Sequence, residues 1–175
     1  MKILCDTIHD EFYPPAPIER ERPAVRGIVL NGRGEIALLH MLGRDVFADR
    51  DHYELPGGGV ETGESFEQAL HREMGEELGL TVDILAEVGI IANEYNRLRR
   101  RDVQHFYLAR ATGHRPIRRT ALEKKLVHGV VWFPAGEILE MYDTRPVENV
   151  GIEVHRRDRI AVAEALRIGK ELGVL

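Results

Sequence analysis

Residues 58–80 read GGVETGESFEQALHREMGEELGL, and this stretch, called the box below, decides the fold. Its fixed positions are Gly58, Glu64, Arg72, Glu73, Glu76, Glu77 and Gly79. If each position is filled at roughly the 7% frequency typical of glycine, an accidental match in a given window has a probability on the order of 10⁻⁸. The spacing therefore carries information about structure and chemistry.

The second half of the box predicts one helix of about three turns. Ser65 followed by Gln68 forms a capping box, in which each side chain serves a backbone amide at the start of the helix. Good helix formers fill the next positions, and Gly79 stands where a left-handed residue would end the helix. We therefore expect a helix between Ser65 and Gly79.

Three glutamates of this helix, Glu73, Glu76 and Glu77, fall on or beside the flank of its apolar stripe. A solvated helix keeps its carboxylates opposite the apolar stripe, and clustered negative charges repel one another unless a cation lies among them. Carboxylate ligands suit a hard divalent ion, whereas zinc would require His or Cys at short spacing. The pattern predicts a Mg²⁺ site, with Mn²⁺ as the alternative.

A glycine-rich loop, Pro56-Gly57-Gly58-Gly59, precedes the helix. Glycines permit backbone turns that side chains forbid, so such a loop can direct main-chain carbonyl and amide groups at a metal or a phosphate. On its own, a run of three glycines more often marks an ordinary turn. Beside a carboxylate helix at this spacing, the loop favours a functional interpretation.

The composition is that of one soluble domain with a substantial core. The chain has 175 residues, of which 43% are hydrophobic and 30% charged. The net charge of -5 argues against bulk attraction to duplex nucleic acid or to an anionic membrane. Cys5 is the only cysteine, which excludes an intramolecular disulfide. With no signal peptide and no membrane-spanning apolar run, we expect a cytoplasmic protein.

Strand and helix patterns flank the box. Two β-branched runs, 24–30 and 35–41, are joined by Asn-Gly-Arg-Gly and predict a hairpin. Residues 42–52 are interpreted as a polar connection. Residues 1–22, which carry three prolines, are expected to form an extended arm or an edge strand. Further strands are expected at 81–93, 103–111 and 126–133, and helices at 135–141 and 156–172.

The box and the order of these elements resemble the Nudix hydrolase family, whose members include MutT-like proteins. The order of hairpin, Leu-Pro-Gly-Gly-Gly entry, box, strands, Trp-Phe-Pro segment and terminal helix resembles that family from about Ala24 to the C-terminus. The resemblance implies a Nudix-type α/β/α sandwich with a mixed β-sheet. Residues 1–22 lie outside it, so we place the Nudix domain at 23–175.

The resemblance implies hydrolysis of a diphosphate bond in a nucleoside diphosphate linked to a group X. Water attacks a phosphorus while divalent ions neutralise the charge on the phosphate oxygens. Nothing in the box identifies X, so a nucleoside triphosphate, an ADP-sugar and a dinucleoside polyphosphate all stay open. A second interpretation is a nucleotide-sensing or regulatory module without turnover. An intact set of carboxylates favours the enzyme.

Carried over position by position, the resemblance also assigns roles to residues in and near the box. Arg72 would orient the glutamates through a salt bridge, and Glu64 corresponds to the supporting glutamate. The general base varies within the family, and we expect Glu73, with Glu123 as the alternative because some members supply a glutamate from that region. The implied metal ligands are Glu73, Glu76, Glu77 and the carbonyl of Gly57 or Gly58.

Candidate substrate contacts lie outside the box. Arginines at 97 and 99–101 crowd the link between two strands, where they could hold phosphates or form a solvated hairpin tip. Tyr95 lies near the distance past the box at which dinucleoside polyphosphate hydrolases carry a tyrosine. The proline that ADP-ribose hydrolases carry nearby is missing. We expect Arg26, Tyr95 and Arg99 to contact a nucleotide-type substrate, and both a monomer and a homodimer stay open.

Overall fold

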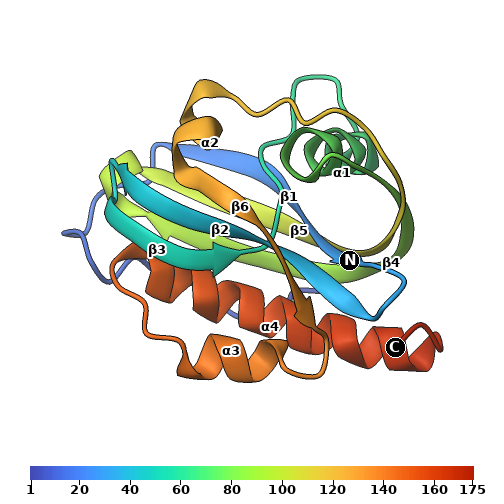
Figure 1. The fold of residues 1–175 in the computed structure, drawn as a ribbon. Helices are drawn as coiled ribbons and strands as arrows, with labels where there is room; N and C mark the ends of the chain where they lie inside the picture. Colours follow the sequence, from blue (N-terminus) through green and yellow to red (C-terminus); the bar gives the residue numbers. More distant parts are fainter.

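A mixed β-sheet between two layers of helices organises the computed structural model, which describes residues 1–175 (Figure 1). The sheet has six strands in the order β3-β2-β1-β5-β4, and β6 pairs with β2. The strands are β1 (Arg20–Leu30), β2 (Glu35–Asp45), β3 (Ala48–Glu54), β4 (Leu80–Tyr95), β5 (Arg100–His114) and β6 (Val127–Pro134). The helices are α1 (Phe66–Glu73), continued by a π turn over Met74–Leu78, α2 (Ala121–Leu126), α3 (Ile138–Thr144) and α4 (Val150–Glu171).

Helices cover both faces of the sheet, α1 and α2 on one side and α3 and α4 on the other (Figure 1). Two hydrophobic cores of nearly equal size result, with 16 buried residues on the α4 side and 15 on the α1 side. Because strand side chains alternate, Ile28 and Leu30 of β1 enter the first core and Val25 and Val29 the second. The predicted α/β/α sandwich is confirmed.

The sheet opens between β1 and β2. These strands share one pair in register, Leu30 with Ile36, next to the turn that joins them. Beyond it, β1 pairs in parallel with β5 along its whole length, whereas β2 pairs with β3 and β6. Two half-sheets therefore diverge from a common end, and the functional cleft lies where they separate.

Leu55 is the point at which the chain passes from one half-sheet to the other. β3 pairs with β2 up to Glu54, and the loop that follows hydrogen-bonds to β1. At the crossing, the Leu55 amide donates to Asp158 Oδ2 at 2.8 Å, and its carbonyl accepts from Arg26 Nη1 at 2.8 Å. Buried backbone groups require such partners, so these two side chains stabilise the crossing.

Two expectations about secondary structure were wrong. Residues 42–52 form the end of β2 and most of β3, joined by a tight turn in which the Phe47 amide donates to Asp45. β3 is an edge strand with exposed residues, which explains its polar sequence. Helix α4 begins at Val150 rather than at 156. The apolar pattern did not reveal its first turns, because buried polar residues interrupt that pattern. Helix α2 was not expected.

The N-terminal residues lie along β4. Ile3 forms an isolated parallel bridge with Ile90, and the buried Ile8 forms another with Asn93. β1 begins at Arg20, within the range expected for the N-terminal arm. The domain boundary at residue 22 stays a prediction.

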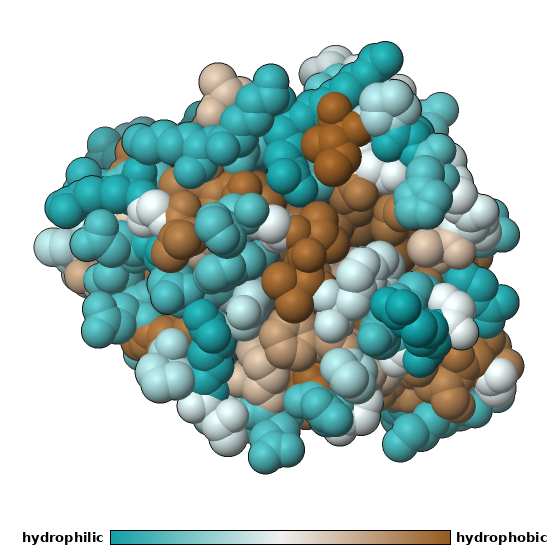
Figure 2. Space-filling view, in the orientation of Figure 1, coloured by the Kyte–Doolittle hydropathy of each residue, from teal (hydrophilic) through white to brown (hydrophobic).

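On the face seen in Figure 2, apolar surface gathers in the middle with hydrophilic residues around it, over the region that β6 crosses in Figure 1. Residues 129–133 of β6 are half-buried, as expected for a strand at the border of the sheet. None of the helices has both the length and the apolar character required to cross a bilayer.

Candidate active site

A cleft of about 710 Å³ opens where the half-sheets separate. Its walls come from β1, β2, β3, the end of β4, β5, the glycine loop, the π turn, α2 and α4. A cavity of this volume accommodates a molecule the size of a nucleotide. The cleft is strongly charged, because six acidic residues and six arginines line it. The arginines are Arg20, Arg22, Arg26, Arg50, Arg100 and Arg157.

The box forms the predicted helix beside this cleft. Gln68 N donates to Ser65 Oγ at 3.2 Å and Ser65 N to Gln68 Oε1 at 2.9 Å, so the capping box is confirmed. Gly79 ends the helix in the left-handed region, with φ 69°. The Arg119 guanidinium donates to the Glu77 carbonyl at 2.7 and 3.2 Å. Both ends of the segment that carries the glutamates are therefore fixed.

Arg72 links the carboxylates of the box to the glycine loop. Its guanidinium donates to both oxygens of Glu64 at 2.9 and 3.0 Å, and to the Gly59 carbonyl at 2.9 Å. It also donates to Glu73 at 2.7 Å and to Glu76 at 3.2 Å. These hydrogen bonds from Arg72 lower the pKa of Glu64. One cation is thus shared among three glutamates.

Two glycines allow buried carboxylates to approach the backbone. Glu77 Oε2 accepts the Gly57 amide at 2.6 Å. Gly57 has φ 141°, and a Cβ there would lie 2.1 Å from the Val25 carbonyl oxygen. A Cβ on Gly58 would lie 2.4 Å from Glu73 Oε1. Any other residue at either position would displace the loop or the carboxylate.

Burial leaves two of these carboxylates short of positive charge. Glu73 is 6% exposed and Glu77 is 5% exposed. Burial raises the pKa of Glu73, although Arg72 opposes the shift. Burial also raises the pKa of Glu77 well above its usual range, and the neighbouring Glu73 adds to the effect while Arg26 opposes it. Such carboxylates are favourable sites for a cation.

The donor set fits a hard divalent ion. Glu73 and Glu77 supply carboxylate oxygens, and the Gly57 carbonyl accepts no hydrogen bond, whereas that of Gly58 accepts the Val25 amide. In the conformation described, no three acidic, His or Cys side chains converge on one point, and Glu76 turns toward Arg72. Carboxylate and carbonyl oxygens are the ligands that magnesium and manganese prefer.

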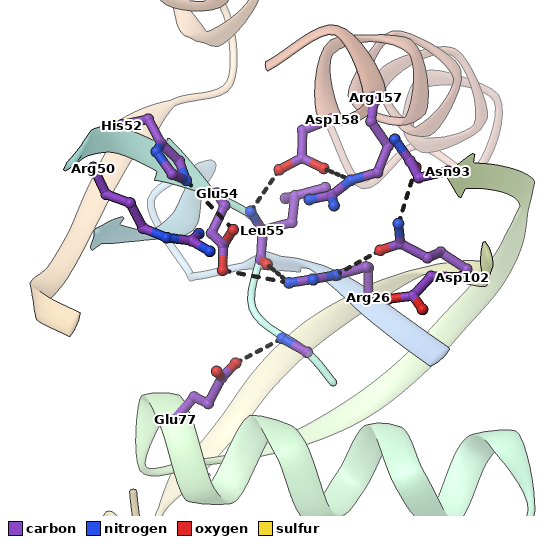
Figure 3. A network of polar contacts seen from close by, with 12 residues as sticks. Arg26, Arg50, His52, Glu54, Leu55, Glu77, Asn93, Asp102, Arg157 and Asp158 are labelled. Carbon is purple, nitrogen blue, oxygen red and sulfur yellow. Dashed lines mark hydrogen bonds and ion pairs between the residues drawn. The ribbon is translucent and has the colours of Figure 1, made fainter. Parts of the chain in front are cut away.

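A network of polar side chains connects this region to α4 (Figure 3). Glu77 lies on the box helix, Arg157 and Asp158 lie on α4, and Arg26 and Leu55 lie between them. Arg26 Nη1 reaches the Leu55 carbonyl, and its Nε donates to Gln104 at 2.9 Å. The network spans both half-sheets and holds the walls of the cleft in place.

A family model for the NUDIX domain matches residues 20–150. The chain belongs to the NUDIX family. A MutT NUDIX hydrolase from Burkholderia pseudomallei has a similar fold, with a TM-score of 0.62 and 22% identity, covering 83% of this chain and 98% of that one.

Two curated relatives match part of the sequence. A putative 8-oxo-dGTP diphosphatase from Bacillus subtilis is 36% identical over 86 residues, which are 49% of this chain and 51% of the relative. An RNA pyrophosphohydrolase from Escherichia coli O139:H28 is 35% identical over 78 residues, which are 45% of this chain and 39% of the relative. The chain thus spans about half the length of the first relative and less than half that of the second.

The structure brings most of the predicted NUDIX site residues to the cleft. Those that line it are Gly57, Gly58, Glu77, Glu123, Arg26 and Tyr95. Glu73 lies against Gly58, and the hydrogen bonds of Arg72 join it to Glu64 and Glu76. Glu123 caps α2, where its Oε2 accepts the Thr120 amide at 2.6 Å.

The four clustered arginines separate in the NUDIX fold. Arg100 lines the cleft and pairs with Asp102 at 2.6 Å. Arg99 does not line the cleft and forms an ion pair with Glu19, and Arg101 pairs with Glu21. A contact between Arg99 and the substrate stays a prediction.

Several cleft residues escaped the sequence analysis, above all Arg20, Arg22, Arg50, Glu54 and Arg157. One signal was available on β1, where arginines at even positions fall on a single face of the strand. A second was the arginine on the apolar stripe of the last helix. Neither pattern distinguishes a cleft from an ordinary charged surface without the neighbouring elements.

Proposed function

We propose that this NUDIX protein is a metal-dependent hydrolase that cleaves a diphosphate bond in a nucleoside diphosphate linked to a group X. One observation carries the proposal: Glu73 and Glu77 are buried with raised pKa values beside a cleft lined by six arginines. Excess negative charge attracts the metal, and the arginines suit phosphates. The names of the curated relatives, a diphosphatase and a pyrophosphohydrolase, support hydrolysis.

The glutamates would hold Mg²⁺, or alternatively Mn²⁺. Glu73, Glu76 and Glu77 would provide carboxylate ligands and Gly57 a carbonyl ligand. When bound, such an ion polarises phosphate oxygens and makes water more acidic. Arg72 keeps the glutamates in position, because its guanidinium donates to two of them and is itself fixed by Glu64.

Glu73 is our candidate for the general base. Burial raises its pKa, so the carboxylate accepts a proton more readily than an exposed glutamate does. The hydrogen bond from Arg72 to Oε1 fixes the orientation of the carboxylate. The alternative base, Glu123, uses its carboxylate to cap α2, which favours Glu73 for the proton transfer.

Arginines along β1 and β5 are proposed to bind the phosphates of a nucleotide-type small molecule. Arg22 and Arg100 share Asp102, at 3.6 and 2.6 Å, so each retains donors that can turn to a phosphate. Burial lowers the pKa of Arg22, and a bound anion would offset that effect. The cytoplasm remains the proposed compartment, and cell fractionation would test it.

A panel of substrates tests the hydrolase. Nucleoside triphosphates, oxidised nucleotides, ADP-ribose, dinucleoside polyphosphates and capped RNA are incubated with the protein and Mg²⁺, and products are identified by mass. We expect cleavage of a diphosphate bond that Glu77→Gln reduces on the order of a thousandfold. Glu67→Gln, an exposed position on the same helix, is the matched control and should retain activity. Tight binding without turnover across the panel would favour the sensor interpretation instead.

A further inference from the structure

The inner end of the cleft differs in character from the carboxylate end. Val150, Val154 and Arg157 follow one stripe of α4 and line the cleft together. Phe47 and Tyr95 belong to the same wall, with ring centroids 5.5 Å apart, and all but the arginine form one buried hydrophobic cluster. The buried Arg157 guanidinium therefore lies beside an apolar, aromatic cluster, and Arg50 and Arg100 stand over its Phe47 and Tyr95 rings at 5.4 and 5.7 Å.

Arg157 has donors that the protein does not use. The residue is 1% exposed, and its Nε donates to Asp158 Oδ1 at 2.7 Å. Neither Nη atom donates to another protein group, and Nη2 is fully buried without a hydrogen-bond partner. A buried donor left unpaired is unfavourable by about 1–3 kcal/mol, so the position favours a ligand that supplies an acceptor.

The acceptor that fits best is uncharged. Asp158 already neutralises Arg157, and its other oxygen is held by the Leu55 amide. A phosphate at this point would add a buried negative charge beside arginines that Asp45, Asp102 and Asp158 already neutralise. A carbonyl or ring nitrogen on a planar group needs only the unpaired donors and a surface to stack on.

We propose that Arg157 recognises the acceptor edge of a 6-oxopurine, so that the substrates of this cleft are guanine-type nucleotides. The proposal rests on the proposed function for its reaction and adds the identity of the base. Guanine presents two adjacent acceptors, O6 and N7, to a guanidinium, whereas adenine presents a donor, the N6 amino group, beside N7. The ring lies against Phe47 and Tyr95, and the phosphates extend toward the box.

Binding of nucleoside monophosphates without metal tests this recognition apart from turnover. Isothermal titration calorimetry on the wild-type protein should show GMP binding about tenfold or more tightly than AMP. Arg157→Lys keeps a cation beside Asp158 but loses the fork of donors, so GMP should weaken to within about threefold of AMP. Arg156→Lys changes the exposed neighbour on the same helix and should leave the ratio as in the wild type.

A modified ligand tests the idea without altering the core. 7-Deazaguanosine monophosphate lacks the N7 acceptor and should bind the wild-type protein about tenfold more weakly than GMP. Equal affinities for GMP and AMP, equal affinities for GMP and its 7-deaza form, or an equal weakening of GMP and AMP in Arg157→Lys would each overturn the proposal.

The two proposals fail separately. Selective GMP binding with no turnover on the substrate panel would remove the hydrolase and leave the base recognition standing. Turnover of guanine and adenine nucleotides at equal kcat/KM, together with equal binding of GMP and AMP, would remove the base recognition and leave the hydrolase standing.

Discussion

Glu54 and Glu77 line the same cleft and are equally inaccessible, at 9% and 5% exposure, yet burial has opposite consequences for them. For Glu54, burial tends to raise the pKa, but Arg26 at 3.7 Å and His52 at 3.6 Å outweigh it and lower the pKa. For Glu77, burial dominates and raises the pKa. The difference lies in the cations that the protein itself provides.

This contrast separates a structural carboxylate from a ligand-binding one. Glu54 is compensated by side chains of its own half-sheet and of β1, so its charge contributes to the stability of the cleft wall. Glu77 receives one backbone hydrogen bond from Gly57, and its charge is left for a partner from solution. Burial alone identifies neither role, and the local charge balance does.

The largest expected effect comes from removing each charge in turn. Without divalent metal at pH 7, Glu54→Gln should lower the free energy of unfolding by about 3 kcal/mol, because Arg26 and His52 lose their buried partner. Glu77→Gln should leave stability unchanged or raise it, since an uncompensated charge disappears while Gln can still accept the Gly57 amide. Urea denaturation measures both, and an equal loss in the two variants would remove the distinction.

The next largest effect is expected from replacing Arg72, whose guanidinium donates to three glutamates of the box. Arg72→Gln should lower kcat about 10- to 100-fold with KM within about threefold of wild type, because the glutamates lose their common support while the phosphate-binding arginines are untouched. Steady-state kinetics at saturating Mg²⁺ provide the test. A rise in KM at unchanged kcat would instead make Arg72 a substrate contact.

Two adjacent arginines test whether binding of the phosphates depends on residues that line the cleft. Arg100→Gln should raise KM about three- to tenfold with little change in kcat, because Arg100 lines the cleft. Arg99→Gln removes the same charge from a side chain that pairs with Glu19 and should change KM less than about twofold. Equal effects would mean that the whole cluster attracts substrate through its field.

A third buried glutamate tests the comparison outside the cleft. Burial raises the pKa of Glu153 on α4 to about 7, and the carboxylates of Asp10 and Glu11 add to the shift. Between the unfolded pKa near 4.5 and about 7, the folded state holds a proton that the unfolded chain releases, so stability falls as the pH rises through this window.

Glu153→Gln removes this dependence. The variant should match the wild type near pH 4.5 and exceed it by about 1 kcal/mol at pH 8, since screening by water reduces the full effect. Thermal unfolding at a series of pH values measures the difference. A gain that is the same at every pH would contradict the assignment, and a Mg²⁺-dependent shift abolished by this variant would make Glu153 a metal ligand.

Local spacing predicted those parts of the site that local interactions determine. The capping box of Ser65, the left-handed Gly79 and the glycine loop depend on residues within a few positions, and the sequence shows them directly. The turn and both strands of the predicted hairpin are present because they too are local, but the strands pair only at Leu30 and Ile36, since β1 pairs mainly with β5 and β2 with β3 and β6. The fold followed from these elements and their order.

The walls of the cleft could not be predicted in the same way, because they depend on contacts distant in sequence. Leu55 meets Asp158 across 103 residues, and Arg26 meets Gln104 across 78. Polar residues at Glu153, Arg157 and Asp158 obscured the first turns of α4, since a buried ion pair has no periodic signature of its own.

The crossing of the chain at Leu55 also links α4 to the box helix. The Leu55 amide is fixed to the base-recognition end through Asp158, and the Gly57 amide, two residues later, is fixed to Glu77. Covalent geometry limits the separation of these amides to about 7 Å. The backbone thus acts as a short tether that keeps Asp158 of α4 and Glu77 of the box helix in a fixed relation across the cleft.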